Sequence, residues 1–427
     1  MKVCVVGGGS TYTPELIEGL LSRRDELDLH EIHLVDVDAG RLGVLGPLAL
    51  RMSERVDDTV RVVWGIDQRA GIVDSTFVVS QMRVGGMAAR ERDEQLGREF
   101  GLVGQETVGV GGFAKALRTI PVALEIAADI ERLAPDATLL NFTNPAGLVT
   151  EALCRHTDVT TIGLCNVPWT IKASVAGALG VDPDSVVFDY VGLNHLSWVR
   201  RVEVAGVDRT VEVLAGLRKH VERQHALVRD GEPDWTPEAI DAIGAIPNSY
   251  LRYYYETDAW VRHQSTRPTR ASAVMALEEA LLECYADPDL TGKPAELAER
   301  GGAYYSEAAA ALMADIATDS GAIHVVNTPN RGAIPGLPGD IVVEVCAVVD
   351  ASRIEPVHVP ELRADVDALV RTVKDFELLT VQAAVDGDRE AAIRALITNP
   401  LGPSINQASR VWDRLVELNA GLLGRLG

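Results

Sequence analysis

The sequence has few of the features that would place it quickly in a class. Only five of its 427 residues are cysteines, and none forms a C-x-x-C pair, so a disulfide framework is not expected. No apolar run reaches about 18 residues, which argues against a membrane-spanning helix. A strand-like segment begins at Met1 and leads straight into a glycine turn, which leaves no room for a signal peptide. We therefore expect a cytoplasmic protein.

Basic residues are also scarce. The 40 lysines and arginines are outnumbered by 62 aspartates and glutamates, giving a net charge of −22. Binding to nucleic acid requires a basic stripe, so nucleic acid is not an expected partner. Any anionic ligand must be met by local positive groups, because the field of the whole molecule does not favour it.

Strand and helix patterns alternate through the first part of the chain. Short runs rich in Val, Ile and Thr are separated by helical segments, a pattern typical of a Rossmann-like, doubly wound and mostly parallel α/β sheet. Strands are predicted near residues 2–8, 31–38, 60–65, 75–82, 137–144 and 159–166.

The pattern changes after about residue 185. Residues 188–206 read as paired antiparallel strands, and the predicted long helices that follow cover 210–227, 270–285 and 302–319. Strands return at 323–328 and 340–348, before a helical tail. We predict two closely packed domains with a cleft between them. Residues 1–190 form the Rossmann-like dinucleotide domain, and residues 191–427 form a mixed α/β domain for substrate, metal and oligomer contacts.

The glycine turn after the first strand predicts a nucleotide site. A helix N-terminus directs free N–H groups at a pyrophosphate, and glycines allow the close approach. An acidic residue at the end of the second strand accepts hydrogen bonds from a ribose hydroxyl, which favours NAD over NADP. The predicted cofactor-binding residues are Gly7, Gly8, Gly9, Ser10, Thr11 and Asp36. A glycine turn without a ligand remains the alternative.

The fingerprint G-x-G-x-x-G is incomplete, because Tyr12 stands at the third glycine position. That glycine normally permits close packing of the helix on the strand. Tyr12 therefore predicts unusual packing at this point.

Polar residues follow several of the predicted strands, where ligands gather in parallel sheets. Cys165 and His195 each follow an apolar run and a glycine. A thiolate and an imidazole can hold a divalent metal and leave positions for substrate oxygens. A buried core cysteine and a turn histidine remain the alternative.

The segment PNSYLRYYYE, residues 247–256, is rich in tyrosine. It is either an aromatic interface patch or the source of a tyrosine base, whose pKa a nearby cation must lower. Arg270 precedes a predicted helix and suits phosphate binding. Glu106, in the loop GQETVGVGGF, is either a partner of the metal site or a loop cap.

Taken in order, these segments resemble glycoside hydrolase family 4, and within it the 6-phospho-β-glucosidases. The matching segments are GGGSTYTPEL, MRVGG, GQETVGVGG, NFTNPAG, GLCNVP, GLNHLSW, PNSYLRYY, TRASAVM, RGGAYYSEAAA and IHVVNTPNRGAIPGLP.

The resemblance implies hydrolysis of 6-phospho-β-glucosides, such as cellobiose 6-phosphate, to glucose 6-phosphate and an alcohol or sugar. It implies NAD and a divalent metal, usually manganese, in place of the two-carboxylate scheme. Hydride passes from carbon 3 of the sugar to NAD, a base removes the carbon 2 proton, and the aglycone is eliminated. Water then adds, and the hydride returns. The partner is a phosphorylated disaccharide or aryl glucoside, and the chain is expected to form a homodimer or homotetramer.

Site residues carry over one by one. The resemblance implies that Cys165 and His195 bind the metal and that Tyr250 is the base. It also implies that Arg90, Asn144 and Arg270 contact substrate, with Arg270 near the 6-phosphate.

Asn166 occupies the position where α-specific members commonly have an aspartate that acts as the acid. Asparagine cannot donate a proton as an acid, which favours the β-specific branch and leaves the acid for the leaving group unassigned. The alternatives are another family 4 glycosidase, of the 6-phospho-α-glucosidase or α-galactosidase type, a plain NAD-dependent dehydrogenase that uses His195, and a non-catalytic nucleotide-binding protein.

Overall fold

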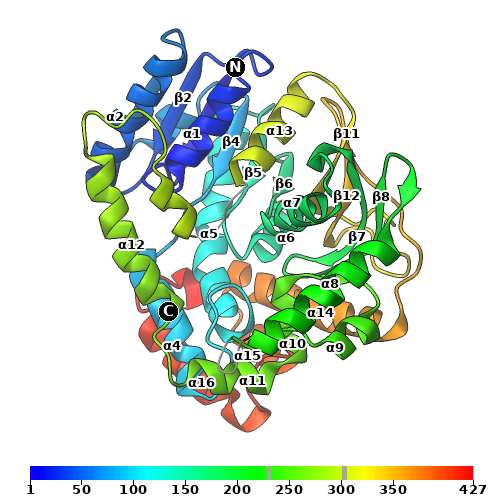
Figure 1. Ribbon diagram of the computed structural model, residues 1–427. Coiled ribbons are helices and arrows are strands. Elements are labelled where there is room, and N and C mark those ends of the chain that lie inside the picture. The colour runs from blue at the N-terminus through cyan, green and yellow to red at the C-terminus, as the bar shows by residue number, and fades with distance from the viewer. Residues whose placement is uncertain (228–231, 301–304, 427) are drawn as a thin grey trace.

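A large mixed sheet organises the molecule. The computed structural model describes residues 1–227, 232–300 and 305–426. The main sheet has nine strands in the order β13-β12-β11-β6-β5-β4-β1-β2-β3, and a smaller sheet has the order β10-β8-β7, with β9 paired to β8 (Figure 1). Strands β1 to β6 pair with one another in parallel, and β11 to β13 extend the sheet antiparallel from β6.

The predicted parallel strands are confirmed, with shorter bounds than the apolar runs suggest. The strands of the main sheet are β1 (Lys2–Val6), β2 (Glu31–Val35), β3 (Arg61–Gly65), β4 (Phe77–Ser80), β5 (Thr138–Asn141), β6 (Thr161–Gly163), β11 (Ala322–Pro329), β12 (Val342–Val349) and β13 (Ile354–Pro356). Asp36, Asn144 and Asn166, at the ends of three of the runs, lie beyond the strands in loops at the carboxyl edge of the sheet.

Helices cover both faces of the sheet, as the doubly wound prediction requires. One face packs against α1, α2 and α13, and the other against α5 and α6, with α14 behind them (Figure 1). The helices of the first part are α1 (Thr13–Ser22), α2 (Ala39–Val56), α3 (Gln68–Ile72), α4 (Gly86–Glu99), α5 (Gly109–Leu133), α6 (Ala146–His156) and α7 (Val167–Leu179).

The second part of the chain begins with the predicted antiparallel pair, β7 (Val186–Leu193) and β8 (Leu196–Val204). Two predicted helices coincide with α8 (Thr210–Leu227) and α12 (Arg270–Tyr285). The third is α13 (Tyr305–Ala317), and residues 302–304 of that prediction lie outside the described residues. The remaining elements are β9 (Val207–Asp208), α9 (Pro237–Ile243), β10 (Ile246–Pro247), α10 (Arg252–Tyr255), α11 (Thr257–Gln264), α14 (Ala364–Asp386), α15 (Arg389–Thr398) and α16 (Ile405–Leu418).

Strands from beyond residue 190 join the main sheet, because β11 pairs with β6. The division at residue 190 therefore remains a prediction about how the chain is organised. Across the ranges that the structure describes, no helix is both long and apolar enough to span a bilayer.

Strand β1 shows how the core is built on both sides of the sheet. Val3 and Val5 pack in one apolar cluster, while Cys4 and Val6 pack in the other. Alternate side chains of a strand point to opposite faces, so a strand covered on both faces is apolar throughout. The polar loops at its carboxyl end are left as the place where a site can form.

Candidate active site

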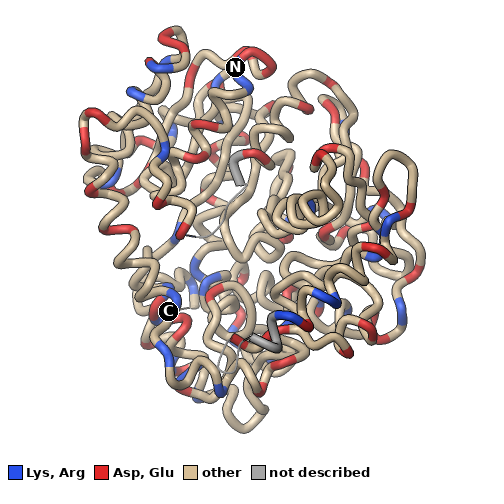
Figure 2. The backbone as a smooth tube through the Cα atoms, in the orientation of Figure 1, with Lys and Arg blue, Asp and Glu red and all other residues tan. Residues whose placement is uncertain are grey.

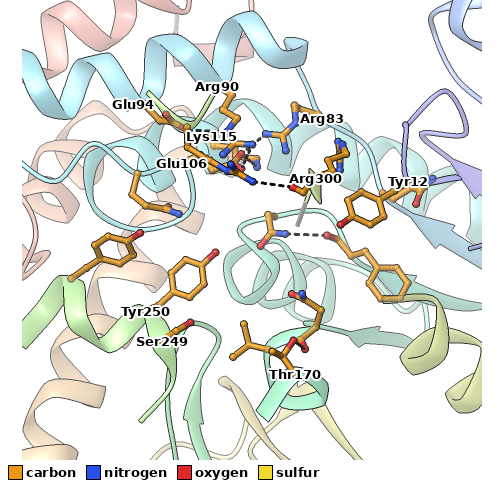
Figure 3. A pocket seen from close by; sticks show the side chains of 18 of the residues that line it. Tyr12, Arg83, Arg90, Glu94, Glu106, Lys115, Thr170, Ser249, Tyr250 and Arg300 are labelled. Atoms are coloured by element: carbon orange, nitrogen blue, oxygen red, sulfur yellow. Dashed lines mark hydrogen bonds and ion pairs between the residues drawn. The ribbon is translucent and has the colours of Figure 1, made fainter. Parts of the chain in front are cut away.

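A large cavity opens along the carboxyl edge of the parallel strands. Its volume is about 2280 Å³, and its wall combines the glycine turn with residues from the loop after β4, from α5, from α12 and from the tyrosine segment (Figure 3). Parts of the chain that are far apart in sequence thus share one space.

The glycine turn is the tightest part of that wall. Gly7 has a φ of +91°, and a Cβ there would come within 2.8 Å of the backbone of Gln81 and Met82. The backbone N–H of Gly9 donates to Asp36 Oδ2 at 2.9 Å. At position 7, only glycine permits both the positive φ and the close approach to the backbone of Gln81 and Met82. The turn therefore leaves a backbone-lined hollow of the kind that a dinucleotide pyrophosphate fills, with the Asp36 carboxylate at its edge.

The six predicted cofactor residues lie together at this turn. Gly7, Gly9, Ser10 and Asp36 line the cavity. Thr11 is buried, and its hydroxyl donates to Glu278 of α12 at 3.2 Å. The arrangement fits a dinucleotide, with the carboxylate held where a ribose hydroxyl would reach it.

Cys165 and His195, predicted as metal ligands, face each other. Cys165 Sγ and His195 Nε2 are 3.6 Å apart, and both side chains are buried. Ligand distances of about 2.3 Å for sulfur and 2.1 Å for nitrogen, at a tetrahedral angle, place the two ligands of one ion about 3.6 Å apart. The pair therefore fits a shared divalent ion. No cluster of three or more His, Cys, Asp and Glu side chains suited to a metal occurs in the described part of the chain.

The environment keeps both groups neutral. Burial raises the pKa of the Cys165 thiol, and nearby Glu344 adds to this, while backbone N–H groups at the start of α7 oppose it. Burial, aided by Lys115, lowers the pKa of His195 to about 3. A neutral imidazole is ready to bind a metal, and a cation at this place would favour the thiolate.

Tyr250 covers the histidine. The two rings stack at 3.8 Å between centroids with an interplanar angle of 1°. Tyr250 lies on a short 3₁₀ turn, Ser249–Leu251. Burial raises the pKa of its phenol, so a role as base requires a cation beside it.

The tyrosine segment forms cavity wall rather than only an outer patch. Tyr250 and Tyr253 both line the cavity, with ring centroids 5.8 Å apart. Asn166, at the N-terminus of α7, lines it too. Cys165 and His195 are buried beside these lining residues, since Cys165 precedes Asn166 and His195 stacks on Tyr250.

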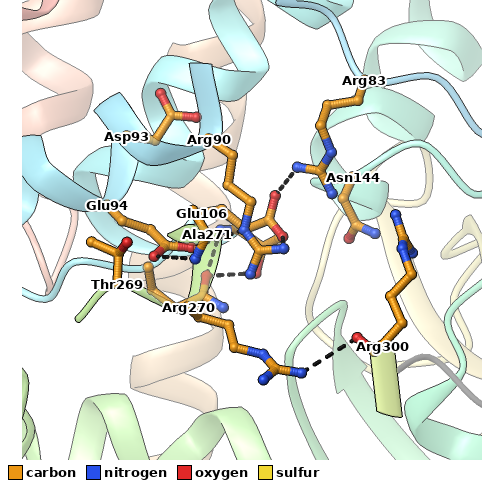
Figure 4. A network of polar contacts seen from close by, with 12 residues as sticks. Arg83, Arg90, Asp93, Glu94, Glu106, Asn144, Thr269, Arg270, Ala271 and Arg300 are labelled. Atoms are coloured by element: carbon orange, nitrogen blue, oxygen red, sulfur yellow. Dashed lines mark hydrogen bonds and ion pairs between the residues drawn. The ribbon is translucent and has the colours of Figure 1, made fainter. Parts of the chain in front are cut away.

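An ionic cluster occupies the opposite wall. Glu106 accepts hydrogen bonds from Arg83 and from Lys115, the latter at 2.7 Å, and pairs with Arg90 at 3.2 Å. Arg90 also donates to Glu94 at 2.8 Å (Figure 4). Glu106 is thus a buried carboxylate that contacts three cations, a role that the sequence did not indicate.

These charged groups shift one another's pKa values. Burial raises the pKa of Glu106, but Arg83, Lys115 and Arg90 outweigh it and hold the pKa well below its usual value. Burial, with Arg83 nearby, lowers the pKa of Lys115 to about 7. Positive groups gather here in a strongly acidic chain, and Figure 2 shows basic segments near the middle of the molecule between α12 and α5.

The three predicted substrate residues reach the same cavity. Arg90, Asn144 and Arg270 all line it. Arg270 begins α12, and its Nη2 donates to the backbone carbonyls of Glu299 and Arg300 at 3.3 and 3.4 Å. Arg270 thus approaches the cationic wall from another element (Figure 4).

Sequence reasoning missed several polar residues of the cavity, among them Lys115, Glu278 and Arg300. Lys115 carried a usable signal, because it is a lone lysine within the mostly apolar sequence of α5. Glu278 and Arg300 carried none, since both lie in segments rich in charged residues.

Family models match the chain in two adjacent pieces. Residues 2–181 match family 4 glycosyl hydrolase, and residues 190–402 match the family 4 glycosyl hydrolase C-terminal domain. The chain belongs to glycosyl hydrolase family 4. The resemblance carried by its motifs is thereby confirmed.

Individual relatives agree over the full length. The chain is 42% identical to a probable 6-phospho-beta-glucosidase of Bacillus subtilis, covering 99% of this chain and 97% of that protein. It is 29% identical to a phospho-alpha-glucosidase of Clostridium acetobutylicum, covering 100% and 99%. The structure of the 6-phospho-beta glucosidase from Thermotoga maritima with manganese, NAD⁺ and glucose-6-phosphate has a TM-score of 0.92 to this chain, with 35% identity and 98% of each chain covered.

Proposed function

We propose that this protein is a 6-phospho-β-glucosidase that uses NAD and a divalent metal, with manganese as the proposed ion. The observation that carries the proposal is the Cys165–His195 pair with Tyr250 stacked on it, beside a cavity that also contains the glycine turn. The likeness to the Thermotoga maritima enzyme, whose structure contains manganese, NAD⁺ and glucose-6-phosphate, supports it.

The proposed roles of the residues are those that the family resemblance implies, and their positions in the cavity support them. NAD supplies a hydride acceptor that is regenerated, and the metal supplies charge stabilisation at the sugar oxygens. Residues 7–11 hold the dinucleotide and Asp36 accepts from its ribose. Cys165 and His195 hold the metal, and Tyr250 removes the proton from carbon 2 of the sugar. Arg90 and Asn144 orient the sugar, and Arg270 binds its phosphate.

The β-specific branch is supported by Asn166. Its amide lines the cavity next to the metal pair, where it can orient a leaving group but cannot protonate it. The higher identity to the β-named relative than to the α-named one points the same way.

The deciding experiment measures release of 4-nitrophenol from 4-nitrophenyl β-glucoside 6-phosphate. We expect release with NAD⁺ and Mn²⁺ present, and none when either is removed by dialysis or chelation. The α-anomer and the unphosphorylated glucoside are the matched controls and are expected to react slowly or not at all. Absence of release in the complete mixture rejects the proposal.

The fate of the hydride distinguishes the proposed glycosidase from a plain dehydrogenase. The proposed reaction returns it, so NADH does not accumulate while the aglycone is released. Accumulation of NADH in proportion to consumed substrate would instead identify a plain dehydrogenase. If fully NAD-free protein released the aglycone at an undiminished rate, the glycosidase activity would stand and the redox mechanism would be rejected.

We further propose a cytoplasmic location and a homodimer or homotetramer. NAD and phosphorylated sugars are retained inside cells because their charges do not cross a bilayer. Tyr255 remains 44% exposed beside the cavity segment, which suits an interface. Light scattering coupled to gel filtration tests the assembly.

A further inference from the structure

Tyr12, which replaces the third glycine of the fingerprint, supports an arginine from the second half of the chain. The guanidinium carbon of Arg300 lies 4.4 Å from the centroid of the Tyr12 ring. Both residues line the cavity (Figure 3). A guanidinium that stacks on an aromatic face is held in orientation as well as attracted. The unusual residue of the turn therefore has a specific partner.

Glu278 fixes the other side of that arginine. Arg300 Nη2 donates to Glu278 Oε1 at 2.6 Å, and the Thr11 hydroxyl donates to the same oxygen at 3.2 Å. Arg41 approaches Glu278 Oε2 at 3.4 Å and donates through Nε to the carbonyl of Gly9 at 2.7 Å. The Glu278 side chain is buried. One carboxylate thus joins the glycine turn, α2 and Arg300.

Helix α12 carries this junction to the sugar end of the cavity. Arg270 is its first residue and donates to the carbonyl of Arg300 at 3.4 Å. Tyr285 is its last residue and donates through its hydroxyl to the carbonyl of Thr11 at 2.8 Å. A continuous helix transmits a displacement along its length, because its backbone bonds hold it rigid. The substrate arginine is therefore tied to the cofactor turn at two points.

We propose that Glu278 is a positioning residue that couples dinucleotide binding to sugar-phosphate binding. A dinucleotide on the turn orders the Thr11–Glu278–Arg300 contacts and with them Arg270, so the phosphorylated sugar no longer has to order them when it binds. The coupling is reciprocal, as thermodynamic linkage requires. The inference rests on the proposed function, which assigns NAD and the 6-phosphate to the two ends of the cavity.

The test measures glucose 6-phosphate affinity by calorimetry, with Mn²⁺ throughout and with or without NAD⁺. We expect NAD⁺ to tighten binding about fivefold or more in the native protein, in the usual range of such couplings. In Glu278→Gln, and in the shorter but charged Glu278→Asp, the ratio should fall to about one. Glu279→Gln, the exposed neighbour on the same helix, should keep the native ratio.

Two outcomes overturn the proposal. One is a native ratio of one, and the other is a native ratio retained in both Glu278 variants. The second outcome is the one expected if Glu278 acted only by repelling phosphates, since Glu278→Gln would then bind each ligand more tightly with the ratio unchanged.

Hydrogen exchange on the unmodified protein tests the coupling without any variant, so the result does not depend on whether the variants fold. NAD⁺ alone should slow exchange of α12 backbone amides, and no change would count against the coupling. None of these readouts needs turnover. Coupling without glycoside cleavage would reject the proposed function alone, and cleavage without coupling would reject only this inference.

Discussion

The two ends of the cavity are built by different means. The cofactor end is a local structure, in which residues 7–11 and Asp36 follow adjacent parallel strands and are joined mainly by backbone hydrogen bonds. The sugar end is assembled from distant side chains, with Glu106, Tyr250 and the Cys165–His195 pair coming from separate loops and helices. A local site is fixed by backbone conformation, and an assembled site depends on the packing of the whole molecule. Changes at the sugar end should therefore remove chemistry or stability. Changes at the cofactor end should act on NAD affinity, and on sugar binding only through the contacts of Thr11 with Glu278 and Tyr285.

The largest effect is expected for Cys165→Ser. A hydroxyl is a much poorer ligand than a thiolate, and losing metal stabilisation worth about 5 kcal/mol corresponds to about 10⁴-fold in kcat. NAD affinity should be unchanged, because the glycine turn lies elsewhere on the cavity wall. Titration with Mn²⁺ followed by electron paramagnetic resonance, together with the aryl glycoside assay, measures both. Cys154→Ser, on α6 and outside the cavity wall, is the matched control. Full metal-dependent turnover in Cys165→Ser would exclude it as a ligand.

Tyr250→Phe tests the chemistry without disturbing the stack. The phenyl ring can keep its contact with His195, while the group that accepts the proton is gone, so kcat should fall by about 10³-fold. Exchange of the carbon 2 proton with deuterated solvent should stop in parallel, and NAD binding should persist. Tyr255→Phe, partly exposed at 44%, is expected to behave as the native protein. Normal turnover in Tyr250→Phe would remove it as the base.

Glu106→Gln tests the ionic wall. Loss of the carboxylate leaves Arg83, Arg90 and Lys115 buried without their common partner, and breaking a buried pair costs about 3–5 kcal/mol in the free energy of unfolding. Urea unfolding near neutral pH measures the loss. The pKa of Glu106 is lowered in the fold, so its contribution is present above the unfolded value and is lost as the pH falls. The gap between native and variant proteins should therefore shrink in acid.

A surface pair gives the control for this buried one. Glu99 pairs with Arg414 at 3.0 Å, and both side chains are partly exposed. Glu99→Gln should cost less than about 1 kcal/mol, as exposed pairs do. Equal losses at Glu99 and Glu106 would show that burial does not set the strength of the ionic wall.

The contrast between the two ends also explains which parts of the fold and of the site could be predicted from the sequence. The parallel strands, the glycine turn and helix α12 follow from apolar periodicity and turn chemistry, which are local. The two helices at 210–227 and 270–285 agree residue for residue. The stacking of Tyr250 on His195 and the convergence of three cations on Glu106 depend on side chains brought together by tertiary packing, which no local pattern contains. Motif resemblance named Tyr250 but could not reveal Glu278 or Arg300, because charged residues in helices and loops are usually solvated.

The smallest effect is expected for Asp36→Asn, which tests the separateness of the cofactor end. The amide keeps an acceptor for the backbone N–H of Gly9 but removes the charge that favours the ribose hydroxyls. A hydrogen bond to a charged group is worth about 1.5 kcal/mol, so NAD affinity should fall about tenfold, with less discrimination against NADP. At saturating NAD⁺ kcat should remain at the native value, since no side chain of the sugar end depends on Asp36. Asp38→Asn, whose carboxylate caps α2 by accepting from the backbone of Arg41, should leave both cofactor affinities unchanged. A drop in kcat at saturating NAD⁺ in Asp36→Asn would mean that the two ends are not built independently, and that the glycine turn takes part in ordering the sugar site beyond the contacts of Thr11.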